Sequence, residues 1–172
     1  MIKVINYAHQ YPNYHLEIVY QQCANIIKDA VQAKRMGWIY RSLLLKSLQN
    51  YSFYIATENN QTDNKESLGM APPPIIGFAL CRELKRTGMI SLDKLGVACA
   101  WRNRGVGTQL LDHIKSVNNT RGSWGMAPPP IRVEVVDHNL RCIAFYTKNG
   151  FVETKNKIIG NGINIIVMYY TP

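Results

Sequence analysis

The chain has 172 residues, of which 47% are hydrophobic and 18% charged, and its formal net charge is +9. This length and composition are typical of a globular domain with its own core, and they exclude a disordered chain. No apolar run reaches the ~18–20 residues that a membrane span needs, and the N-terminal stretch MIKVINYAHQYPNYH lacks the apolar segment of a secretory signal. We therefore expect a cytoplasmic protein with no membrane partner.

The positive charge favours anionic partners such as nucleotide phosphates or nucleic acid. Because Lys and Arg are spread along the chain and form no tail, nucleic acid is a possible partner but not the favoured one. Four cysteines, far apart and without C-x-x-C spacing, are expected to be small buried apolar residues rather than metal ligands: Cys23, Cys81, Cys99 and Cys142.

Hydrophobic periodicity predicts two helices in the N-terminal part, over residues 16–35 and 40–48, and a strand over 51–57. Strands are predicted over 75–84 and 89–99, followed by a helix over about 105–117 with Val106, Leu110, Leu111 and Ile114 inward.

The C-terminal part reads as a strand over 131–136, a helix over 139–149 that ends at Gly150, and two strands, 151–159 and 163–170, paired across the turn GNG. This order places one β-α-β unit between antiparallel segments. The prediction is an α/β (α+β) fold around a single sheet.

The heptapeptide GMAPPPI occurs twice, at 69–75 and 125–131, with unrelated flanks. Three consecutive prolines cannot continue a helix or a central strand. We interpret both copies as loop insertions that lead straight into a strand, and a docking motif in polyproline conformation is the alternative.

The stretch LDKLGVACAWRNRGVGTQLL, residues 92–111, reads as strand, turn and helix. A helix N-terminus presents unpaired N–H groups and partial positive charge, which favour a bound phosphate. Gly105 and Gly107 have no Cβ, so a diphosphate can approach the backbone, and Arg102 and Arg104 add positive charge. The P-loop pattern is absent and the dinucleotide pattern is incomplete, because position 110 is Leu.

Two stretches together resemble motifs A and B of the GCN5-related N-acetyltransferase (GNAT) superfamily. Arg102, Gly105 and Gly107 match the pattern Q/R-x-x-G-x-G/A of the first. The second, N-x-x-A-x-x-F/L-Y-x-x-x-G-F, is matched by five residues, with Cys142 in place of the usual Ala: Asn139, Phe145, Tyr146, Gly150 and Phe151.

The resemblance implies a single N-acetyltransferase domain over 1–172, with a twisted, mostly antiparallel sheet of six or seven strands that is splayed in the middle and flanked by four helices. It implies acetyl-CoA as cosubstrate, without a metal. The implied cofactor-binding residues are Leu95, Gly96, Val97, Arg102, Asn103, Arg104, Gly105, Val106, Gly107, Thr108, Asn139 and Tyr146.

Acetyl transfer to an amine needs a base for the ammonium proton, a donor for the thioester oxygen and an acid for the leaving thiolate. A backbone N–H near Val97 is the candidate donor, and the resemblance implies Tyr146 as acid. The candidate base is Glu134, which strand alternation places opposite Val133 and Val135. The alternatives are Asp93, His113, His138 and a water chain.

The predicted function is acetyl-CoA-dependent acetyl transfer to a primary amine of a small molecule or a protein N-terminus. Two alternatives stay open: acetylation of aminoacyl-tRNA, which the charge would suit, and an acyl-CoA-binding module without turnover. The sequence leaves a monomer and a homodimer equally open.

Overall fold

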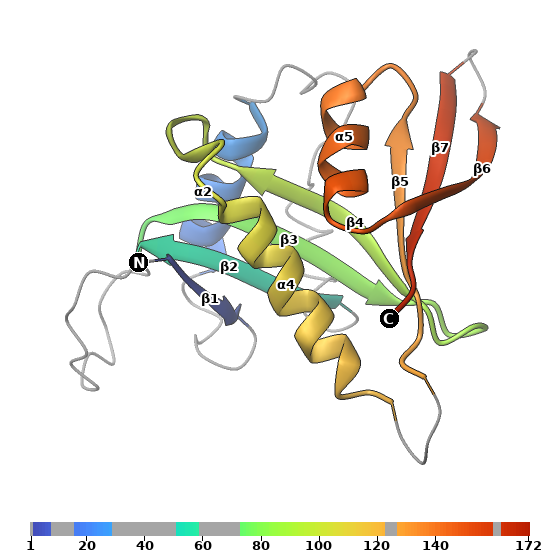
Figure 1. The fold of residues 1–172 in the computed structure, drawn as a ribbon. Coiled ribbons are helices and arrows are strands. Elements are labelled where there is room, and N and C mark those ends of the chain that lie inside the picture. The colour runs from blue at the N-terminus through green and yellow to red at the C-terminus, as the bar shows by residue number, and fades with distance from the viewer. Residues whose placement is uncertain (1, 8–15, 29–50, 59–72, 123–126, 160–162) are drawn as a thin grey trace. The chain divides into compact units, whose positions relative to one another are not determined.

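The computed structural model describes residues 2–7, 16–28, 51–58, 73–122, 127–159 and 163–172. One sheet of seven strands runs in the order β1-β2-β3-β4-β5-β7-β6 (Figure 1). The strands are β1 (Ile2–Asn6), β2 (Tyr51–Glu58), β3 (Ile75–Glu83), β4 (Ile90–Val97), β5 (Ile131–Val136), β6 (Val152–Ile159) and β7 (Ile163–Tyr170). The described part of the chain also forms α2 (Leu16–Lys28), α4 (Val106–Asn119), α5 (Leu140–Lys148) and the 3-10 turn η2 (Cys99–Trp101).

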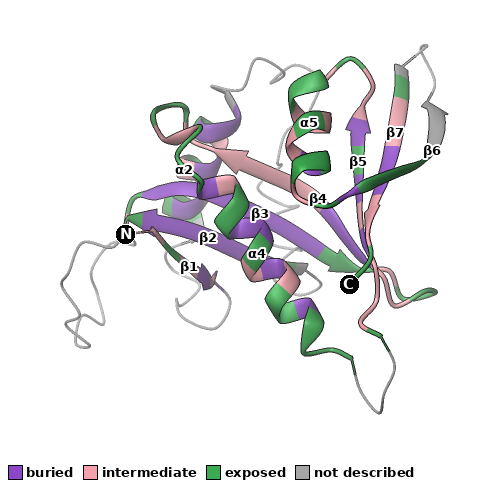
Figure 2. Cartoon of the chain, in the orientation of Figure 1, coloured by how far each residue is buried: buried purple, intermediate pink, exposed green. Residues whose placement is uncertain are grey.

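The chain divides into two compact units, which are described separately. The first comprises residues 1–80 and 94–110. Its core packs the apolar side of α2, including Val19 and Cys23, against Phe53 of β2 and Phe78 of β3. Figure 2 shows β2 and β3 buried along most of their length, as expected for strands that are covered on both faces. The end of β4 and the start of α4 belong to the same unit as this core.

The second unit comprises residues 81–93 and 111–172. Within it β4 and β5 run parallel, with three residue pairs from Ile90–Ile131 to Leu92–Val133. Strand β5 then pairs antiparallel with β7, from Ile131–Tyr170 to Val136–Ile165, and β7 pairs antiparallel with β6. Figure 1 shows β5 and β7 side by side. The predicted β-α-β unit is therefore present, since parallel neighbours need a crossover connection such as α4.

The predicted elements agree with the structure at most positions. Helix α4 buries all four residues predicted to face inward: Val106, Leu110, Leu111 and Ile114. Helix α5 ends before Gly150, whose φ of 82° is the left-handed conformation expected after a helix. The described residues contain three α-helices rather than four, because the predicted helix over 40–48 and the end of the first lie outside them. Strand β1 and the turn η2 were not predicted.

Each GMAPPPI copy ends inside the sheet. Its last residue, Ile75 in one copy and Ile131 in the other, begins a strand and is buried. In the second copy the carbonyl of Pro129 accepts a hydrogen bond from the Asn118 amide (2.7 Å), and that of Pro130 accepts one from the Ile90 N–H (3.1 Å). The end of this copy is therefore part of the fold, whereas residues 69–72 and 125–126 lie outside the described ranges.

The prediction of buried cysteines is correct for two of the four. Cys23 and Cys81 are buried, Cys142 is half-buried and Cys99 is exposed. Cys99 differs because β4 ends at Val97, so the residue lies in η2 and not in the sheet.

Candidate functional site

The turn that leads into α4 has an unusual backbone. Asn103 and Gly105 have φ values of 60° and 80°, in the left-handed region that favours glycine. The first hydrogen bond of the helix runs from the N–H of Gln109 to the carbonyl of Gly105 (2.9 Å). The N–H groups of Val106, Gly107 and Thr108 precede this bond, so they have no carbonyl of their own helix to donate to. The turn thus places three adjacent donors at the positive end of the α4 dipole.

Space around this turn suits an anion. Among the residues that the structure describes, a Cβ added at Gly105 would meet only the side-chain nitrogen of Gln109, at 4.0 Å. Thr108 is exposed and Gly107 is half-buried, whereas Val106 is buried and anchors the helix. The φ of 80° favours glycine at position 105, and the described residues leave the backbone beside it open.

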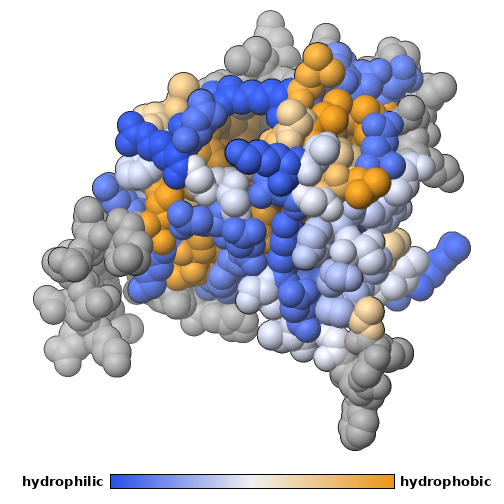
Figure 3. All heavy atoms as spheres, in the orientation of Figure 1, coloured by the Kyte–Doolittle hydropathy of each residue, from blue (hydrophilic) through white to orange (hydrophobic). Residues whose placement is uncertain are grey.

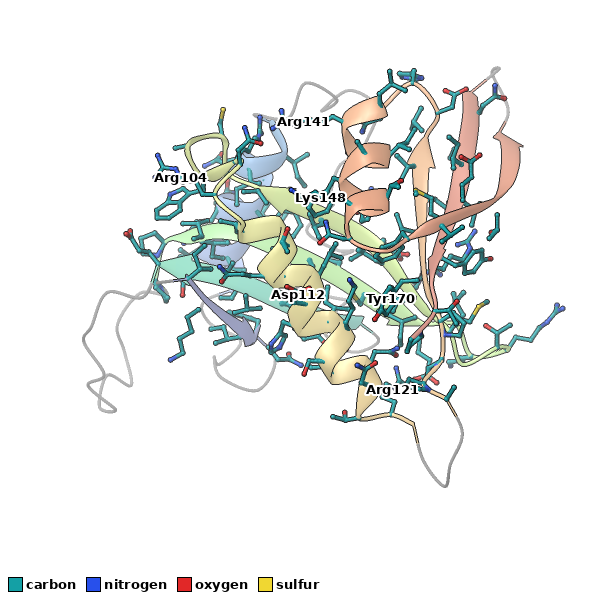
Figure 4. The ribbon with its side chains drawn as sticks, in the orientation of Figure 1. Arg104, Asp112, Arg121, Arg141, Lys148 and Tyr170 are labelled. Carbon is teal, nitrogen blue, oxygen red and sulfur yellow. The ribbon has the colours of Figure 1, made fainter. Side chains whose placement is uncertain are left out.

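The two arginines of the turn make different contacts. Arg104 is exposed, with its guanidinium carbon 5.4 Å from the centre of the Trp101 ring; Figure 4 shows it in the loop that precedes α4. Arg102 is half-buried, and its Nε donates to the carbonyl of Val97 (3.1 Å). The prediction assigned both side chains to the diphosphate; in the structure, Nε of Arg102 is used by the end of β4.

Strand β4 carries Leu95, Gly96 and Val97 beyond its last pair with β5. A Cβ at Gly96 would lie 2.8 Å from the Phe78 ring, closer than real Cβ atoms lie, and it would also make a tight contact of 3.1 Å with Ile26. Gly96 is thus needed for close packing, which is a reason additional to the backbone binding predicted for it. The N–H of Ala98 donates to the carbonyl of Ile76 on β3 (2.9 Å).

Gly77, which sequence reasoning did not select, supports the same region. A Cβ there would lie 2.8 Å from Val106 Cγ1 and 3.2 Å from both the Gly96 carbonyl and Leu110 Cδ1. The start of α4 thus rests directly on the backbone of β3. A single glycine inside a strand pattern signals such a close approach.

Asn139 and Tyr146 lie in the second unit, on α5. Asn139 is the N-cap, and its Oδ1 accepts a hydrogen bond from the N–H of Cys142 (3.3 Å). Residues 139, 142 and 146 are spaced three and four apart, so they lie along one side of the helix. Sequence reasoning assigned Asn139 to the cofactor arm; its side-chain oxygen caps the helix that carries Tyr146.

Tyr146 is buried, with 8% of its surface exposed. Its ring packs edge-on against Phe145 and Phe151, at centroid distances of 5.2 and 5.3 Å. Burial, with smaller contributions from Cys142 and Cys81, raises the pKa of Tyr146 well above its ordinary value. The phenol therefore keeps its proton throughout the physiological range, as an acid must.

The two candidate carboxylates are both held by arginines. Glu134 is exposed on β5, on the face opposite Val133 and Val135 as predicted, and it pairs with Arg132. Asp93 on β4 pairs with Arg82 (2.7 Å) and accepts a hydrogen bond from the Ser91 hydroxyl (2.6 Å).

The histidines are in other surroundings. His113 is half-buried on α4, where desolvation lowers its pKa. His138 is exposed beside Asp137 at 3.1 Å, in the loop between β5 and α5.

The site residues thus fall into two groups. Leu95 to Thr108 belong to the first unit, and Glu134, Asn139 and Tyr146 belong to the second. In the described ranges no three His, Cys, Asp or Glu side chains are grouped as metal ligands. None of the helices described is long and apolar enough to cross a membrane.

The model of the acetyltransferase (GNAT) domain matches residues 49–153, which is more than half of the chain. The chain therefore belongs to the GNAT acetyltransferase family. This confirms an acetyltransferase that uses acetyl-CoA as cosubstrate, which is the coarser part of the predicted class of enzyme. A comparison with curated proteins gives no match.

Solved structures share the fold. The ribosomal-protein-S18-alanine N-acetyltransferase of Escherichia coli is 18% identical, with a TM-score of 0.68 over 99% of this chain and 94% of its own. NAA60 of Arabidopsis thaliana in complex with acetyl-CoA is 15% identical, with a TM-score of 0.69 over 99% and 98%. A putative streptothricin acetyltransferase of Bacillus anthracis in complex with acetyl coenzyme A is 21% identical, with a TM-score of 0.54 over 72% and 64%.

Proposed function

We propose that the chain is an acetyl-CoA-dependent N-acetyltransferase whose acceptor is a primary amine of a small molecule or a protein N-terminus. The observation that carries the proposal is the turn before α4, with Gly105 at a φ of 80° and space beside it that the described residues leave open. Family membership supports acetyl transfer from acetyl-CoA, and the turn would bind the diphosphate. Among the solved structures of the same fold, one is named as an acetyltransferase of a protein and another as an acetyltransferase of a small molecule. The proposal therefore keeps both acceptor classes.

The turn and the end of β4 would hold the cosubstrate. The N–H groups of Val106, Gly107 and Thr108 would donate to the diphosphate, with Arg104 and Asn103 beside them. The backbone of Leu95, Gly96 and Val97 would pair with the amides of the pantetheine arm, because this part of β4 extends beyond its last pair with β5. Asn139 would support the arm indirectly, as the cap of α5.

When bound, the thioester supplies an activated acetyl carbon, to which the acceptor nitrogen bonds as the carbon–sulfur bond breaks. One proton leaves the ammonium, and Glu134 would accept it, with Asp93 as the alternative. One proton reaches the thiolate, and Tyr146 would donate it. The N–H of Val97 would stabilise the negative charge that develops on the carbonyl oxygen.

The direct test follows thiol release from acetyl-CoA in the presence of amines, peptides with free N-termini, and aminoacyl-tRNA. We expect release with an amine or a peptide. The variant that tests the turn before α4 is Gly105→Val, because a β-branched residue strongly disfavours a φ of 80°. It should raise the Kd for CoA, measured by calorimetry.

Thiol release with aminoacyl-tRNA and with no other acceptor would show that the acceptor is aminoacyl-tRNA and not a small amine or a protein N-terminus. Binding of acetyl-CoA without release for any acceptor would favour an acyl-CoA-binding module. A Gly105→Val variant that binds CoA like wild type would contradict the assignment of the turn. A cytoplasmic location, a monomer or homodimer, and one domain over 1–172 with GMAPPPI insertions stay predictions.

A further inference from the structure

We infer that Arg102 is a positioning residue, whose side chain fixes the direction of the Val97 N–H through the peptide that joins Val97 to Ala98. The inference rests on the proposed function, in which that N–H stabilises the reacting carbonyl oxygen. It differs from the role that the sequence pattern suggests for Arg102, that of a charge for the diphosphate.

The peptide between Val97 and Ala98 is held at both ends. Its N–H donates to the carbonyl of Ile76 on β3 (2.9 Å), and its carbonyl accepts from Nε of Arg102 (3.1 Å). A trans peptide is planar, with its N–H and C=O in opposite directions. The two bonds therefore fix the rotation of this peptide, and the carbonyl of Val97 points away from β3.

The direction of the Val97 N–H follows. In an extended strand the N–H and C=O of one residue point to the same side, since a residue in a hydrogen-bonded antiparallel pair exchanges both with one partner. The N–H of Val97 therefore also points away from β3, at a position five residues beyond Leu92, the last residue of β4 that pairs with β5. Without the Arg102 bond, the link to Ile76 would be the one remaining hydrogen bond of this peptide within the described part of the chain.

A second contact of the Arg102 side chain also lies within this loop. Its Nη1 lies 3.7 Å from Sγ of Cys99, in the η2 turn. Arg104 differs, because it is exposed and stacked over Trp101. An anion can bind the guanidinium of Arg104 without breaking a hydrogen bond to β4. The structure thus separates the two arginines into a positioning role and a charge role.

The experiment compares three substitutions at Arg102. Gln places its side-chain nitrogen the same number of bonds from Cα as Arg Nε, so it keeps the donor without the charge. Lys keeps the charge with the nitrogen one bond further out, and Met keeps a similar length with neither. We expect kcat to stay within about threefold of wild type for Arg102→Gln and to fall about ten- to hundred-fold for Arg102→Met.

Two acetyl donors, acetyl-CoA and S-acetylpantetheine, distinguish a positioning role of Arg102 from a role in diphosphate binding. S-acetylpantetheine has the thioester but no diphosphate. For a positioning residue, Arg102→Met should lower kcat equally with acetyl-CoA and with S-acetylpantetheine, without raising the KM for either. Arg104→Gln should raise the KM for acetyl-CoA alone. Arg86→Gln, in the exposed turn between β3 and β4, is the neutral control.

The inference is overturned if Arg102→Lys restores activity better than Arg102→Gln, or if the Arg102→Met defect is a raised KM that disappears with S-acetylpantetheine. Those outcomes would assign Arg102 to the diphosphate. A readout independent of turnover is the NMR signal of the Val97 and Ala98 amides. Both should shift, and Ala98 should exchange faster, in Arg102→Met but not in Arg102→Gln.

The NMR readout also distinguishes failure of the inference from failure of the proposed function. If wild type transfers acetyl to no acceptor while the amides respond as expected, the proposed function fails and the positioning by Arg102 stands. If the amide signals of Arg102→Met equal those of wild type, the positioning role is wrong regardless of activity.

Discussion

Asp93 on β4 and Glu134 on β5 occupy corresponding positions on neighbouring parallel strands, each one residue beyond the pair Leu92–Val133 that ends the ladder between these strands. Since side chains alternate along a strand, both lie on the face opposite Leu92 and Val133. Arg82 holds one carboxylate and Arg132 the other. The two candidates for the base are therefore alternatives within one face of the sheet rather than two separate sites.

Removing the base should abolish the acidic limb of the pH–rate profile. We expect Glu134→Gln to lower kcat/KM by about 10²–10⁴, because an amide cannot accept the ammonium proton. The measurement is the pH dependence of kcat/KM for the best acceptor amine. Asp93→Asn is the matched variant, and it should keep the acidic limb although it loosens the contacts to Arg82 and Ser91.

Three outcomes would change the assignment. If Asp93→Asn loses the acidic limb and Glu134→Gln keeps it, the base is Asp93. If the double variant alone loses it, either carboxylate suffices. If all variants keep it, a water chain carries the proton, and the contribution of the two carboxylates is limited to the fold.

The hydroxyl of Tyr146 can be removed with little effect on packing. Its ring contacts Phe145 and Phe151, and phenylalanine preserves both contacts. We expect Tyr146→Phe to lower kcat by about 10²-fold or more, because the thiolate then leaves without a proton donor. The Kd for acetyl-CoA, measured by calorimetry, should change little. A variant that binds weakly but turns over normally would assign Tyr146 to binding instead of proton donation.

Gly77 should be intolerant of even a methyl group. In Gly77→Ala the new Cβ would lie 2.8 Å from Val106 Cγ1, so the start of α4 must move. We expect a loss of about 1–3 kcal/mol in the free energy of unfolding and a raised KM for acetyl-CoA. Gly88→Ala is the control: its φ of 69° carries strain of about 1–2 kcal/mol, but no atom of the described residues lies within 4 Å of its Cβ. Urea denaturation and kinetics compare the two.

A Gly77→Ala variant with the stability and KM of wild type would show that β3 and α4 have room to separate. A KM effect in Gly88→Ala would show that the KM responds to stability alone. In the expected result only Gly77→Ala changes binding.

Elements whose residues repeat with a clear period could be predicted from the sequence. Helix α4 follows from Val106, Leu110, Leu111 and Ile114, which recur at helical spacing, and all four are buried. Strand β5 follows from the alternation around Glu134. Strand β1 was missed because its five residues, IKVIN, alternate only weakly, and pairing with β2 decides its conformation.

The site could be predicted less completely, because a motif names residues but not their partners. The pattern around Arg102 indicates charge, yet its Nε is used by the carbonyl of Val97. Asn139 matches a motif position, but the hydrogen bond to the Cys142 N–H makes it a helix cap. Both contacts depend on the path of the backbone in three dimensions, which residue types and spacing do not specify.

The surface also has apolar positions that periodicity does not explain. Leu140 at the start of α5 and Val152 on β6 are 74% and 64% exposed. Figure 3 shows hydrophobic atoms at the surface in the region of α5. Isolated exposed apolar residues are common, so these positions identify no partner.

Buried thiols predict a loss of stability at alkaline pH. Burial raises the pKa of Cys23 and of Cys81 well above their ordinary value of 9.0, and Asp93 adds to the shift at Cys81. In the unfolded chain both thiols ionise near that ordinary value, while in the native state they keep their protons. The unfolded state then binds fewer protons, so the free energy of unfolding is unaffected well below pH 9 and falls as the pH rises above it.

The expected slope is about 1.4 kcal/mol per pH unit for each thiol. Cys81→Ala and Cys23→Ala should each reduce the slope of unfolding free energy against pH by the contribution of one thiol, and the double variant should reduce it by two. The comparison of slopes does not depend on how much stability each substitution removes at neutral pH. Urea denaturation between pH 7 and 10.5, with a reducing agent, measures these slopes. A slope in Cys81→Ala equal to that of wild type would mean that the Cys81 thiol ionises equally readily in the native and unfolded states, and that its burial beside Asp93 does not hold the proton.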